Sequence, residues 1–262
     1  MRIALVGYGR MGRAVEEVAA AREHAVVARI GRPELEGGPP AIAGALADAE
    51  VAIDFSTGAL VPVIAGACAD AGVSLVTGTT GLPSDALDAL ARAADSGIGV
   101  VHGPNFSIGV QLFFRVARSA AHLFDAVGGY DTHIHEAHHR HKLDHPSGTA
   151  RRLADLLVDA LAEKRRWEAG PPEARAAHDV LYVTSTRAGE IPGTHTLGFE
   201  GAHDRIELVH EARGREGFAA GAVRAAEWVR TRRGVFTFEE VVDELLAGTG
   251  QDARGIDDGR SG

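Results

Sequence analysis

The chain has 262 residues, enough for one large domain or two smaller ones, and its hydrophobic content of 45% is typical of a globular protein. A formal net charge of −9, from 27 basic and 36 acidic residues, argues against nonspecific nucleic-acid binding, which needs a basic surface. The single cysteine, Cys68, excludes an intramolecular disulfide and a zinc site built from several cysteines. The apolar run before Gly7 is too short for a signal peptide and no run of ~18 apolar residues occurs, so we expect a cytoplasmic protein with no membrane partner.

The first hundred residues alternate between short apolar runs and segments of helical composition. The runs are rich in β-branched residues, as in strands buried on both faces of a parallel sheet, and cover residues 3–6, 25–30, 51–55, 74–77 and 99–102. The helical segments cover residues 11–22, 59–71 and 84–96. This alternation predicts an α/β fold whose N-terminal part is a Rossmann-type, doubly wound parallel sheet.

The pattern changes after Gly103. In chain order we expect a helix over 108–124, a polar strand over 131–137, a histidine-rich loop, a helix from Ser147 to near Trp167 and an exposed connection over 168–179. Alternating segments at 180–186, 195–199 and 206–210 predict strands of an antiparallel or mixed sheet with one exposed face, and helices are expected over 217–231 and 236–246. These elements predict a second, α+β domain with a mixed sheet.

The domain boundaries follow from these elements. Residues 1–106 are expected to form a dinucleotide-binding domain that is completed by residues 216–247, and residues 107–215 are expected to form the second domain. Residues 248–262 have almost no apolar content, which predicts a disordered tail.

A glycine-rich turn opens the first domain. Residues 7–12 match G-x-G-x-x-G between a predicted strand and a predicted helix, the context in which this pattern indicates dinucleotide binding. Gly7 permits the tight turn, Gly9 lets a pyrophosphate approach the backbone and Gly12 packs the helix on the strand. The N–H groups at the helix N-terminus would then face the phosphates. The predicted cofactor contacts here are Gly7, Tyr8, Gly9, Arg10, Met11 and Gly12.

The end of the second strand is where the adenosine ribose is usually recognised. An NAD site normally places a carboxylate there, but this chain has Gly31 and then Arg32, with no carboxylate until Glu34. Arg29 and Arg32 either face a 2′-phosphate or are solvated surface residues. We therefore expect NADPH or NADH as the cofactor, with NADPH favoured and Arg32 as the more plausible phosphate contact.

Five of the thirteen histidines lie within residues 133–141, and the following residues continue to Thr149. A zinc site and a solvated basic loop are both alternatives, but adjacent His138 and His139 point to opposite faces of a strand and no H-E-x-x-H helix is present, so no metal is expected. An anion-binding active site is favoured, because histidine and lysine can transfer protons and Ser147 can cap a helix whose N-terminus attracts a carboxylate.

With these residues in view, the chain closely resembles the 4-hydroxy-tetrahydrodipicolinate reductase (dihydrodipicolinate reductase) family. The motifs that carry the resemblance are residues 6–12, Gly78-Thr79-Thr80-Gly81, Pro104-Asn105-Phe106-Ser107, and residues 136–142 continuing to Pro146-Ser147-Gly148-Thr149. Shorter matches lie at residues 187–189 and 215–218, and the resemblance covers roughly residues 1–247. Many members keep an acidic residue where this chain has Gly31, so NADH recognition departs from the family pattern.

The resemblance implies an oxidoreductase of lysine biosynthesis by the diaminopimelate route. It would reduce 4-hydroxy-tetrahydrodipicolinate, a small dicarboxylate, to tetrahydrodipicolinate with loss of water, at the expense of NADH or NADPH. By motif position, His138 is the catalytic histidine, Lys142 the proton donor, and His139, Gly148 and Thr149 the substrate contacts. The resemblance adds cofactor contacts at Gly78, Thr79, Thr80, Gly103, Pro104, Asn105 and Phe106. It also implies a homotetramer assembled through the sheet of the second domain.

Two other functions are open to a chain with this glycine turn. Another Rossmann reductase, such as an aspartate or homoserine dehydrogenase, would lack the histidine-rich loop. A regulator that binds NAD(P)H without turnover would need no proton donor, whereas this chain has both His138 and Lys142.

Overall fold

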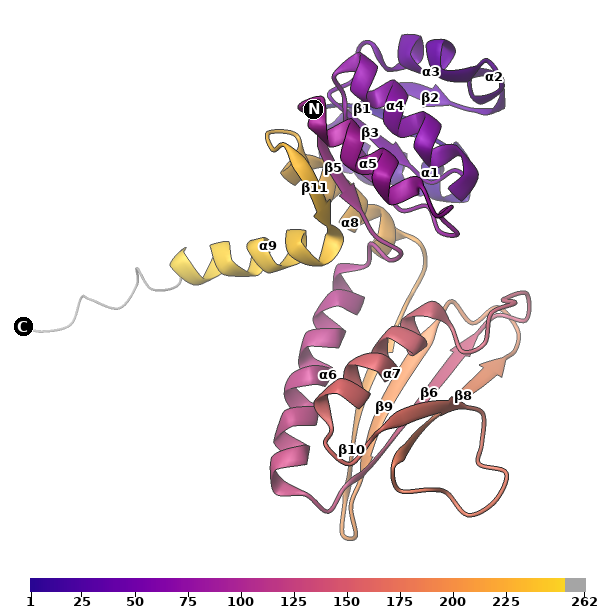
Figure 1. Cartoon of the computed structure of the whole chain (residues 1–262), viewed down its shortest axis with the longest axis vertical. Coiled ribbons are helices and arrows are strands. Elements are labelled where there is room, and N and C mark those ends of the chain that lie inside the picture. The colour runs from indigo at the N-terminus through magenta and orange to yellow at the C-terminus, as the bar shows by residue number, and fades with distance from the viewer. Residues whose placement is uncertain (253–262) are drawn as a thin grey trace, which may run out of the picture. The chain divides into compact units, whose positions relative to one another are not determined.

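A computed structural model describes residues 1–252 and divides the chain into two compact units. Unit 1 comprises Met1–Ile108 together with the chain from Arg215 onward, and unit 2 comprises Gly109–Gly214. Figure 1 shows the elements of both units along the chain. None of the helices in the described part of the chain combines the length and apolar character needed to cross a membrane.

Unit 1 is built on a six-stranded sheet in which every neighbouring pair is parallel. In spatial order its strands are β11 (Gly234–Thr237), β5 (Gly99–His102), β4 (Ser74–Thr77), β3 (Val51–Asp54), β1 (Arg2–Val6) and β2 (Ala25–Ile30). Chain order reverses its direction across the sheet between β1 and β3, which leaves a topological switch point at the carboxyl ends of these strands.

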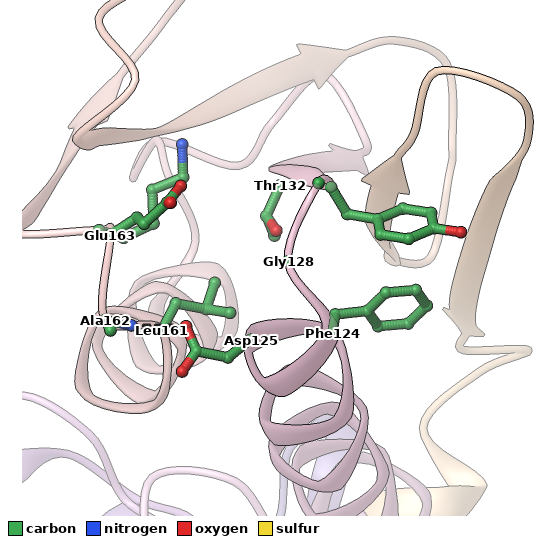
Figure 2. Close-up of a pocket in the computed structure, with 10 residues that line it drawn as sticks. Phe124, Asp125, Gly128, Thr132, Leu161, Ala162 and Glu163 are labelled. Carbon is green, nitrogen blue, oxygen red and sulfur yellow. Dashed lines mark hydrogen bonds between the residues drawn. The ribbon is translucent and has the colours of Figure 1, made fainter.

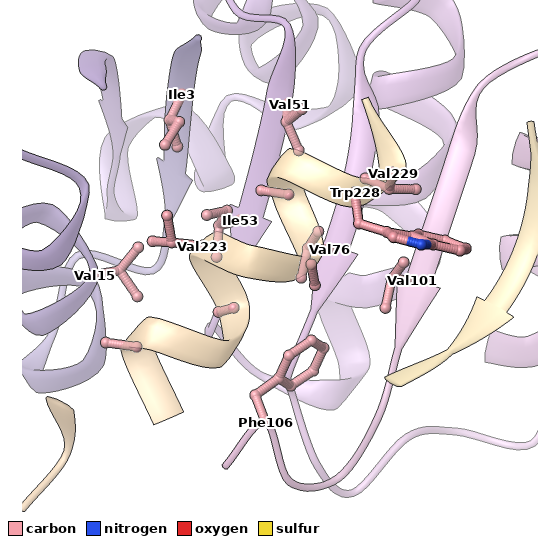
Figure 3. Packing of buried hydrophobic residues seen from close by; sticks show 14 of the residues in the cluster. Ile3, Val15, Val51, Ile53, Val76, Val101, Phe106, Val223, Trp228 and Val229 are labelled. Carbon is pink, nitrogen blue, oxygen red and sulfur yellow. The ribbon is translucent and has the colours of Figure 1, made fainter. Parts of the chain in front are cut away.

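Helices cover both faces of this sheet, so the predicted doubly wound arrangement is confirmed. One face packs on α1 (Arg10–Ala21) and α8 (Glu216–Val229), and the other on α3 (Gly38–Leu46), α4 (Val61–Ala71) and α5 (Ala86–Asp95). Side chains alternate along β1, with Ile3 and Leu5 in the first layer and Ala4 and Val6 in the second. Figure 3 shows the first layer, where side chains of α1, α8 and the strands interdigitate.

Three segments of unit 1 differ from the sequence-based expectation. Residues 32–46 were assigned no helix, but they form α2 (Arg32–Glu36) and α3, since the prolines fall in the first turns, where a missing N–H costs nothing. Gly234–Thr237 is an edge strand, whereas residues 236–237 were predicted as the start of a helix, and α9 (Phe238–Asp252) begins directly after the strand. A short 3₁₀ turn, η1 (Gly58–Leu60), precedes α4.

Unit 2 is a five-stranded mixed sheet with helices on one face. Its strands, in spatial order, are β10 (Arg205–Glu211), β9 (Thr194–Glu200), β6 (Asp131–His138), β8 (Val180–Arg187) and β7 (Arg166–Ala169). β6, β7 and β8 are parallel, and β9 is antiparallel to both β6 and β10. The apolar side chains of one face pack with α6 (Ile108–Val127) and α7 (Gly148–Ala160), as predicted for a mixed sheet with one exposed face.

The end of α7 was predicted wrongly. The helix stops at Ala160 instead of continuing to Trp167, and Trp167 lies in the edge strand β7, where its indole N–H donates to Asp155 (2.7 Å). Lys164 lies between the end of α7 and β7, and its side chain is buried. Its ammonium donates to Asp131 and to two backbone carbonyls, which holds this segment in an extended conformation.

The predicted tail, residues 248–262, divides at Asp252. Helix α9 extends to Asp252 and so includes the first residues of that segment, while residues 253–262 lie outside the described part of the chain.

Gly221 on α8 sets how closely that helix approaches the loop after β5. A Cβ at Gly221 would lie 1.7 Å from the Phe106 carbonyl oxygen, a backbone atom that has little freedom to move. We therefore expect Gly221→Ala to lower the free energy of unfolding by about 1–3 kcal/mol through overpacking. Gly66→Ala on the exposed side of α4, where a Cβ meets nothing within 4 Å, should instead stabilise by about 0.5–1 kcal/mol. Urea unfolding measures both, and equal effects of the two substitutions would contradict the packing argument.

Candidate active site

The glycine turn after β1 has the geometry of a phosphate-binding turn. Gly7 has a φ of 82°, and a Cβ there would lie 2.7 Å from the Phe55 carbonyl oxygen. A Cβ at Gly12 would lie 2.8 Å from the Gly7 carbonyl oxygen, whereas Gly9 has no atom within 4 Å of this position. Gly7 and Gly12 are therefore required by packing, and Gly9 leaves the N-terminus of α1 open to a ligand. The first N–H groups of a helix have no partner within it, so they are available to an anion.

Two side chains next to this turn are hydrogen-bonded to Glu16. The Tyr8 hydroxyl donates to Glu16 on α1, and the Arg29 guanidinium donates to the same carboxylate. These hydrogen bonds lower the pKa of Glu16 and raise that of Arg29. The Arg29 side chain is therefore held against α1 by Glu16. The side chain of Arg32 is 87% exposed and lies 3.8 Å from Glu36.

An acidic group does stand at the end of β2, although Gly31 itself carries no side chain. The Glu34 carboxylate turns back and accepts a hydrogen bond from the Gly31 N–H (2.9 Å), as in a capping box. In the sequence, Glu34 lies three residues after Gly31, so it was not predicted to bind the ribose. The turn into α2 brings its carboxylate back to the strand end.

Two further predicted cofactor loops follow the adjacent strands β4 and β5. Thr79 lies in the first loop, and its hydroxyl donates to the buried carboxylate of Asp54 (2.9 Å). Phe106 lies in the second loop, and its ring is buried between Phe55 and Phe238, so only its backbone is available to a ligand. Thr80 and Pro104 are exposed, and Gly78, Gly103 and Asn105 are partly exposed.

Asp54 is a residue that the sequence analysis missed. Its carboxylate ends β3 and also accepts hydrogen bonds from the Thr77 hydroxyl (2.8 Å) and the Ser56 N–H (2.9 Å). Burial raises the pKa of Asp54, and these hydrogen bonds oppose the rise. The carboxylate thereby fixes the loops after β3 and β4. A polar residue that closes an otherwise apolar strand was the available signal.

The histidine-rich segment of unit 2 is organised around Glu136. On β6, alternate residues face the helices, which brings Ile134, Glu136 and His138 to the same side. Glu136 has no exposed surface and accepts hydrogen bonds from His138 Nδ1 (2.5 Å), both terminal nitrogens of Arg187 (2.7 and 2.9 Å) and the Ser147 N–H (3.3 Å). Burial alone would raise the pKa of Glu136, but these donors hold it well below its ordinary value.

His195 on β9 lies beside this group and is neutral. Its ring is edge-on to that of His138, with centroids 5.2 Å apart, and its Nε2 is 3.0 Å from the Ser147 hydroxyl. That hydroxyl also accepts the N–H of Ala150 as the cap of α7, so it links His195 to the start of the helix. Burial, together with the charge of nearby His138, lowers the pKa of His195 to about 3.

The loop between β6 and α7 already holds a carboxylate. Asp144 Oδ1 lies 2.8 Å from the Lys142 ammonium, and the same carboxylate accepts a hydrogen bond from the N–H of Gly148, the first residue of α7. Burial raises the pKa of Asp144, but the Lys142 ammonium and the Gly148 N–H bring it below its ordinary value. A lysine and a helix N-terminus therefore converge on one anion position, the arrangement that the sequence predicted for a substrate carboxylate.

The remaining predicted residues lie around this position with different exposure. His139 is partly exposed, and its buried Nδ1 has no hydrogen-bond partner among the described residues. His141 is 71% exposed and 3.9 Å from Glu190, so it belongs to the outer edge of the loop. Across residues 1–252, no group of three or more His, Cys, Asp or Glu side chains is arranged to hold a metal ion.

A separate cavity of about 170 Å³ lies at the C-terminal end of α7, whereas the histidine cluster lies at its N-terminal end (Figure 2). It is lined by Phe124, Asp125, Gly128, Gly129, Tyr130, Thr132, Leu161, Ala162, Glu163 and Lys164. Asp125 accepts the Ala162 N–H there (2.8 Å), and none of the predicted site residues takes part. The candidate active site is therefore the histidine cluster, not this cavity.

Comparisons with known proteins identify the family. The model for "Dihydrodipicolinate reductase, N-terminus" matches residues 1–106, and that for "Dihydrodipicolinate reductase, C-terminus" matches residues 109–242. The chain belongs to the dihydrodipicolinate reductase family. The resemblance found in the sequence is thereby confirmed.

Individual relatives agree with this assignment. The 4-hydroxy-tetrahydrodipicolinate reductase of Christiangramia forsetii is 35% identical over 94% of this chain and 99% of its own length. The corresponding reductase of Alkalilimnicola ehrlichii is 41% identical over 92% of this chain and 98% of its own. A dipicolinate-bound dihydrodipicolinate reductase from Paenisporosarcina sp. TG-14 shares the fold, with a TM-score of 0.72 at 23% identity over 92% of this chain and 98% of that structure.

The neutral, buried state of His195 has a consequence for stability. Its pKa is lowered from 6.5 to about 3, so below pH 6.5 the unfolded chain takes up a proton that the folded chain does not. The free energy of unfolding should therefore fall as the pH is lowered from about 6.5 toward 3, by up to about 1.4 kcal/mol per pH unit for this group.

Replacement of His195 by glutamine isolates this effect. His195→Gln keeps an acceptor for the Ser147 hydroxyl but cannot titrate, so its unfolding free energy should fall less steeply between pH 7 and 5. His122→Gln, at an exposed position of α6, should keep the slope of the unmodified protein. Urea unfolding at each pH measures the three slopes, and the argument fails if His195→Gln and the unmodified protein have the same slope.

Proposed function

We propose that this protein reduces 4-hydroxy-tetrahydrodipicolinate to tetrahydrodipicolinate, with loss of water, in the diaminopimelate route of lysine biosynthesis. Membership of the dihydrodipicolinate reductase family supports this proposal. The observation that carries it is the anion position in unit 2, where the Lys142 ammonium and the Gly148 N–H converge on the Asp144 carboxylate. A carboxylate of the substrate would take the place of Asp144.

In this proposal, unit 1 binds the nicotinamide cofactor. Gly7 and Gly12 are required by the close approach of backbone atoms, and Gly9 leaves the N-terminus of α1 open, which fits a pyrophosphate. A bound NADH or NADPH would supply the hydride. The loops after β4 and β5 lie at the carboxyl ends of parallel strands, where such sheets bind their ligands.

The residues of unit 2 would bind the dicarboxylate and move protons. The Lys142 ammonium would hold a carboxylate and donate the proton that balances hydride addition, and Gly148 and Thr149 would bind the carboxylate at the start of α7. His139 would add a further contact, and His138, on the same side of β6 as Glu136, would face the reacting ring. The neutral His195 behind them adds no positive charge to compete with that of Lys142.

We also propose that the protein assembles as a homotetramer through the sheet of unit 2. The helices α6 and α7 cover only one face of this sheet. The other face carries His135, whose ring meets Thr184 (2.9 Å), and the exposed apolar side chain of Val209 on β10, which shares this face with Thr196 and His135. A sheet face of this mixed character is suited to packing against a second copy.

Lys142 is the residue whose loss should stop turnover. We expect Lys142→Ala to lower kcat by about 10²–10⁴, the usual range for losing a general acid, while cofactor affinity remains nearly unchanged. His141→Ala, in the same loop at an exposed position, should retain turnover. The measurement is oxidation of NAD(P)H that depends on the product of dihydrodipicolinate synthase. Near-normal turnover of Lys142→Ala would overturn the assignment of the proton donor.

Arg32 is expected to make NADPH at least as good a cofactor as NADH. Its guanidinium is exposed beside the end of β2, where a 2′-phosphate would lie, and it lies 3.8 Å from the Glu36 carboxylate. Arg32→Ala should lower kcat/KM for NADPH roughly tenfold to a hundredfold, since a charge-assisted pair contributes about 1.5–3 kcal/mol, and should leave NADH little changed.

The matched control for Arg32 is Glu36→Gln, which removes the neighbouring carboxylate but keeps the guanidinium. This variant should not lose activity with NADPH. If the unmodified protein strongly prefers NADH and Arg32→Ala does not change that preference, other residues recognise the ribose.

A further inference from the structure

The Glu136 carboxylate is fully buried and accepts hydrogen bonds from several donors. Oε2 accepts from His138 Nδ1 (2.5 Å) and Arg187 Nη1 (2.9 Å), and Oε1 accepts from Arg187 Nη2 (2.7 Å) and the Ser147 N–H (3.3 Å). The donors come from β6, β8 and the start of α7. Such a complete set of donors is what an ionised carboxylate needs when it is removed from water.

This environment determines which nitrogen of His138 carries the hydrogen. An ionised carboxylate can only accept hydrogen bonds, so the short contact between Glu136 and Nδ1 requires a hydrogen on Nδ1. When the imidazole is neutral, its Nε2 is therefore unprotonated and can accept a proton. When the imidazole is charged, Nε2 carries the proton that can be donated. In both states Nε2 is the nitrogen available to a substrate.

One neighbour of Nε2 is a glycine, which leaves space beside that nitrogen. Gly193 has a φ of 144°, a conformation that favours glycine, and a Cβ there would lie 3.0 Å from His138 Nε2. The edge-on ring of His195 packs beside the imidazole and limits its rotation. Glycine at 193 therefore leaves space next to the reactive nitrogen, while Glu136 and His195 fix the ring.

Arg187 keeps Glu136 in place and links it to the substrate loop. Its side chain is 18% exposed, and its two terminal nitrogens form a fork on the carboxylate. Nη2 also donates to the backbone carbonyl of Asp144 (2.7 Å), within the loop that carries Lys142. One guanidinium thus holds both the carboxylate behind His138 and the segment that presents the proton donor.

We propose that Glu136 and Arg187 are positioning residues for the reduction, a role that rests on the proposed function. Glu136 fixes His138 as the Nδ1–H tautomer and directs Nε2 toward the substrate. Arg187 orients the Glu136 carboxylate and anchors the loop of Lys142. Their charges offset each other, so their contribution is orientation of the imidazole and of the loop, not a net field at the site.

The tautomer is tested directly by ¹⁵N NMR of histidine-labelled protein, with the His138 signals assigned by comparison with His138→Gln. At a pH where the ring is neutral, the unmodified protein should show the hydrogen on Nδ1. In Glu136→Gln the amide can donate as well as accept, so the hydrogen should move wholly or partly to Nε2. A hydrogen on Nε2 of the unmodified protein, or an unchanged tautomer in Glu136→Gln, overturns the proposal.

Turnover of the same variants tests whether the tautomer matters. Glu136→Gln should lower kcat by at least about tenfold, and by up to about 10⁴-fold if the wrong tautomer behaves as in a serine protease triad, with little change in KM for the cofactor. Glu190→Gln, an 82% exposed carboxylate beside His141, is the matched control and should retain kcat. An unchanged kcat in folded Glu136→Gln overturns the positioning role.

Loss of a buried charge can unfold a protein, so a second pair of variants keeps the test decisive. Glu136→Gln/Arg187→Met removes both charges together, and Arg187→Lys keeps the charge but not the fork. Both should be folded by circular dichroism and impaired in kcat, and full activity of either would contradict the proposal. Absence of turnover in the unmodified protein would instead refute the proposed function. The NMR result does not depend on turnover, so it still tests the tautomer of His138 in that case.

Discussion

The geometry of the candidate active site in unit 2 depends on the hydrogen bonds that compensate one buried carboxylate. This carboxylate belongs to Glu136, which has no exposed surface. Removing an ion from water costs several kcal/mol, so such a group persists only when donors surround it. Here the donors come from His138 on its own strand, from Arg187 on β8 and from the backbone of Ser147 before α7. The requirement to satisfy one charge thus fixes the positions of a strand end, a neighbouring strand and the start of a helix.

Unit 1 also contains a buried carboxylate that is surrounded by hydrogen-bond donors. Asp54 is also fully buried at a strand end, and it accepts hydrogen bonds from Ser56, Thr77 and Thr79 in place of a guanidinium. Neutral donors compensate burial less well, and the pKa of Asp54 is raised while that of Glu136 is lowered. Asp54 therefore orders the loops after β3 and β4 through hydrogen bonds from neutral donors.

The sequence predicted what depends on local pattern and missed what depends on tertiary contacts. The buried strands of unit 1, the glycine turn and the cap at Ser147 follow from periodicity and residue type, and they are present. The edge strands Gly234–Thr237 and Arg166–Ala169 were missed, and residues 236–237 and 166–167 were assigned to the ends of helices, because four residues carry little periodicity and their partners are distant in sequence. Glu136 was read as part of a histidine-rich motif, and His195 only as the first residue of a predicted strand. Their roles arise only when β8, β9 and α7 surround them.

The anion position of unit 2 attracts a negative group although the protein has a net charge of −9. At physiological ionic strength the Debye length is about 8 Å, so most surface carboxylates have little effect at the loop, and the groups within that distance decide its affinity. These groups include Lys142 and the N-terminus of α7, which already bind the Asp144 carboxylate, and the Arg187 guanidinium, which donates to the Asp144 carbonyl. Asp144 is about half exposed, so its ion pair is worth no more than about 1 kcal/mol. Under the proposed function, a dicarboxylate that makes several contacts at once would therefore displace Asp144, and this internal carboxylate would compensate the positive charge whenever no substrate is bound.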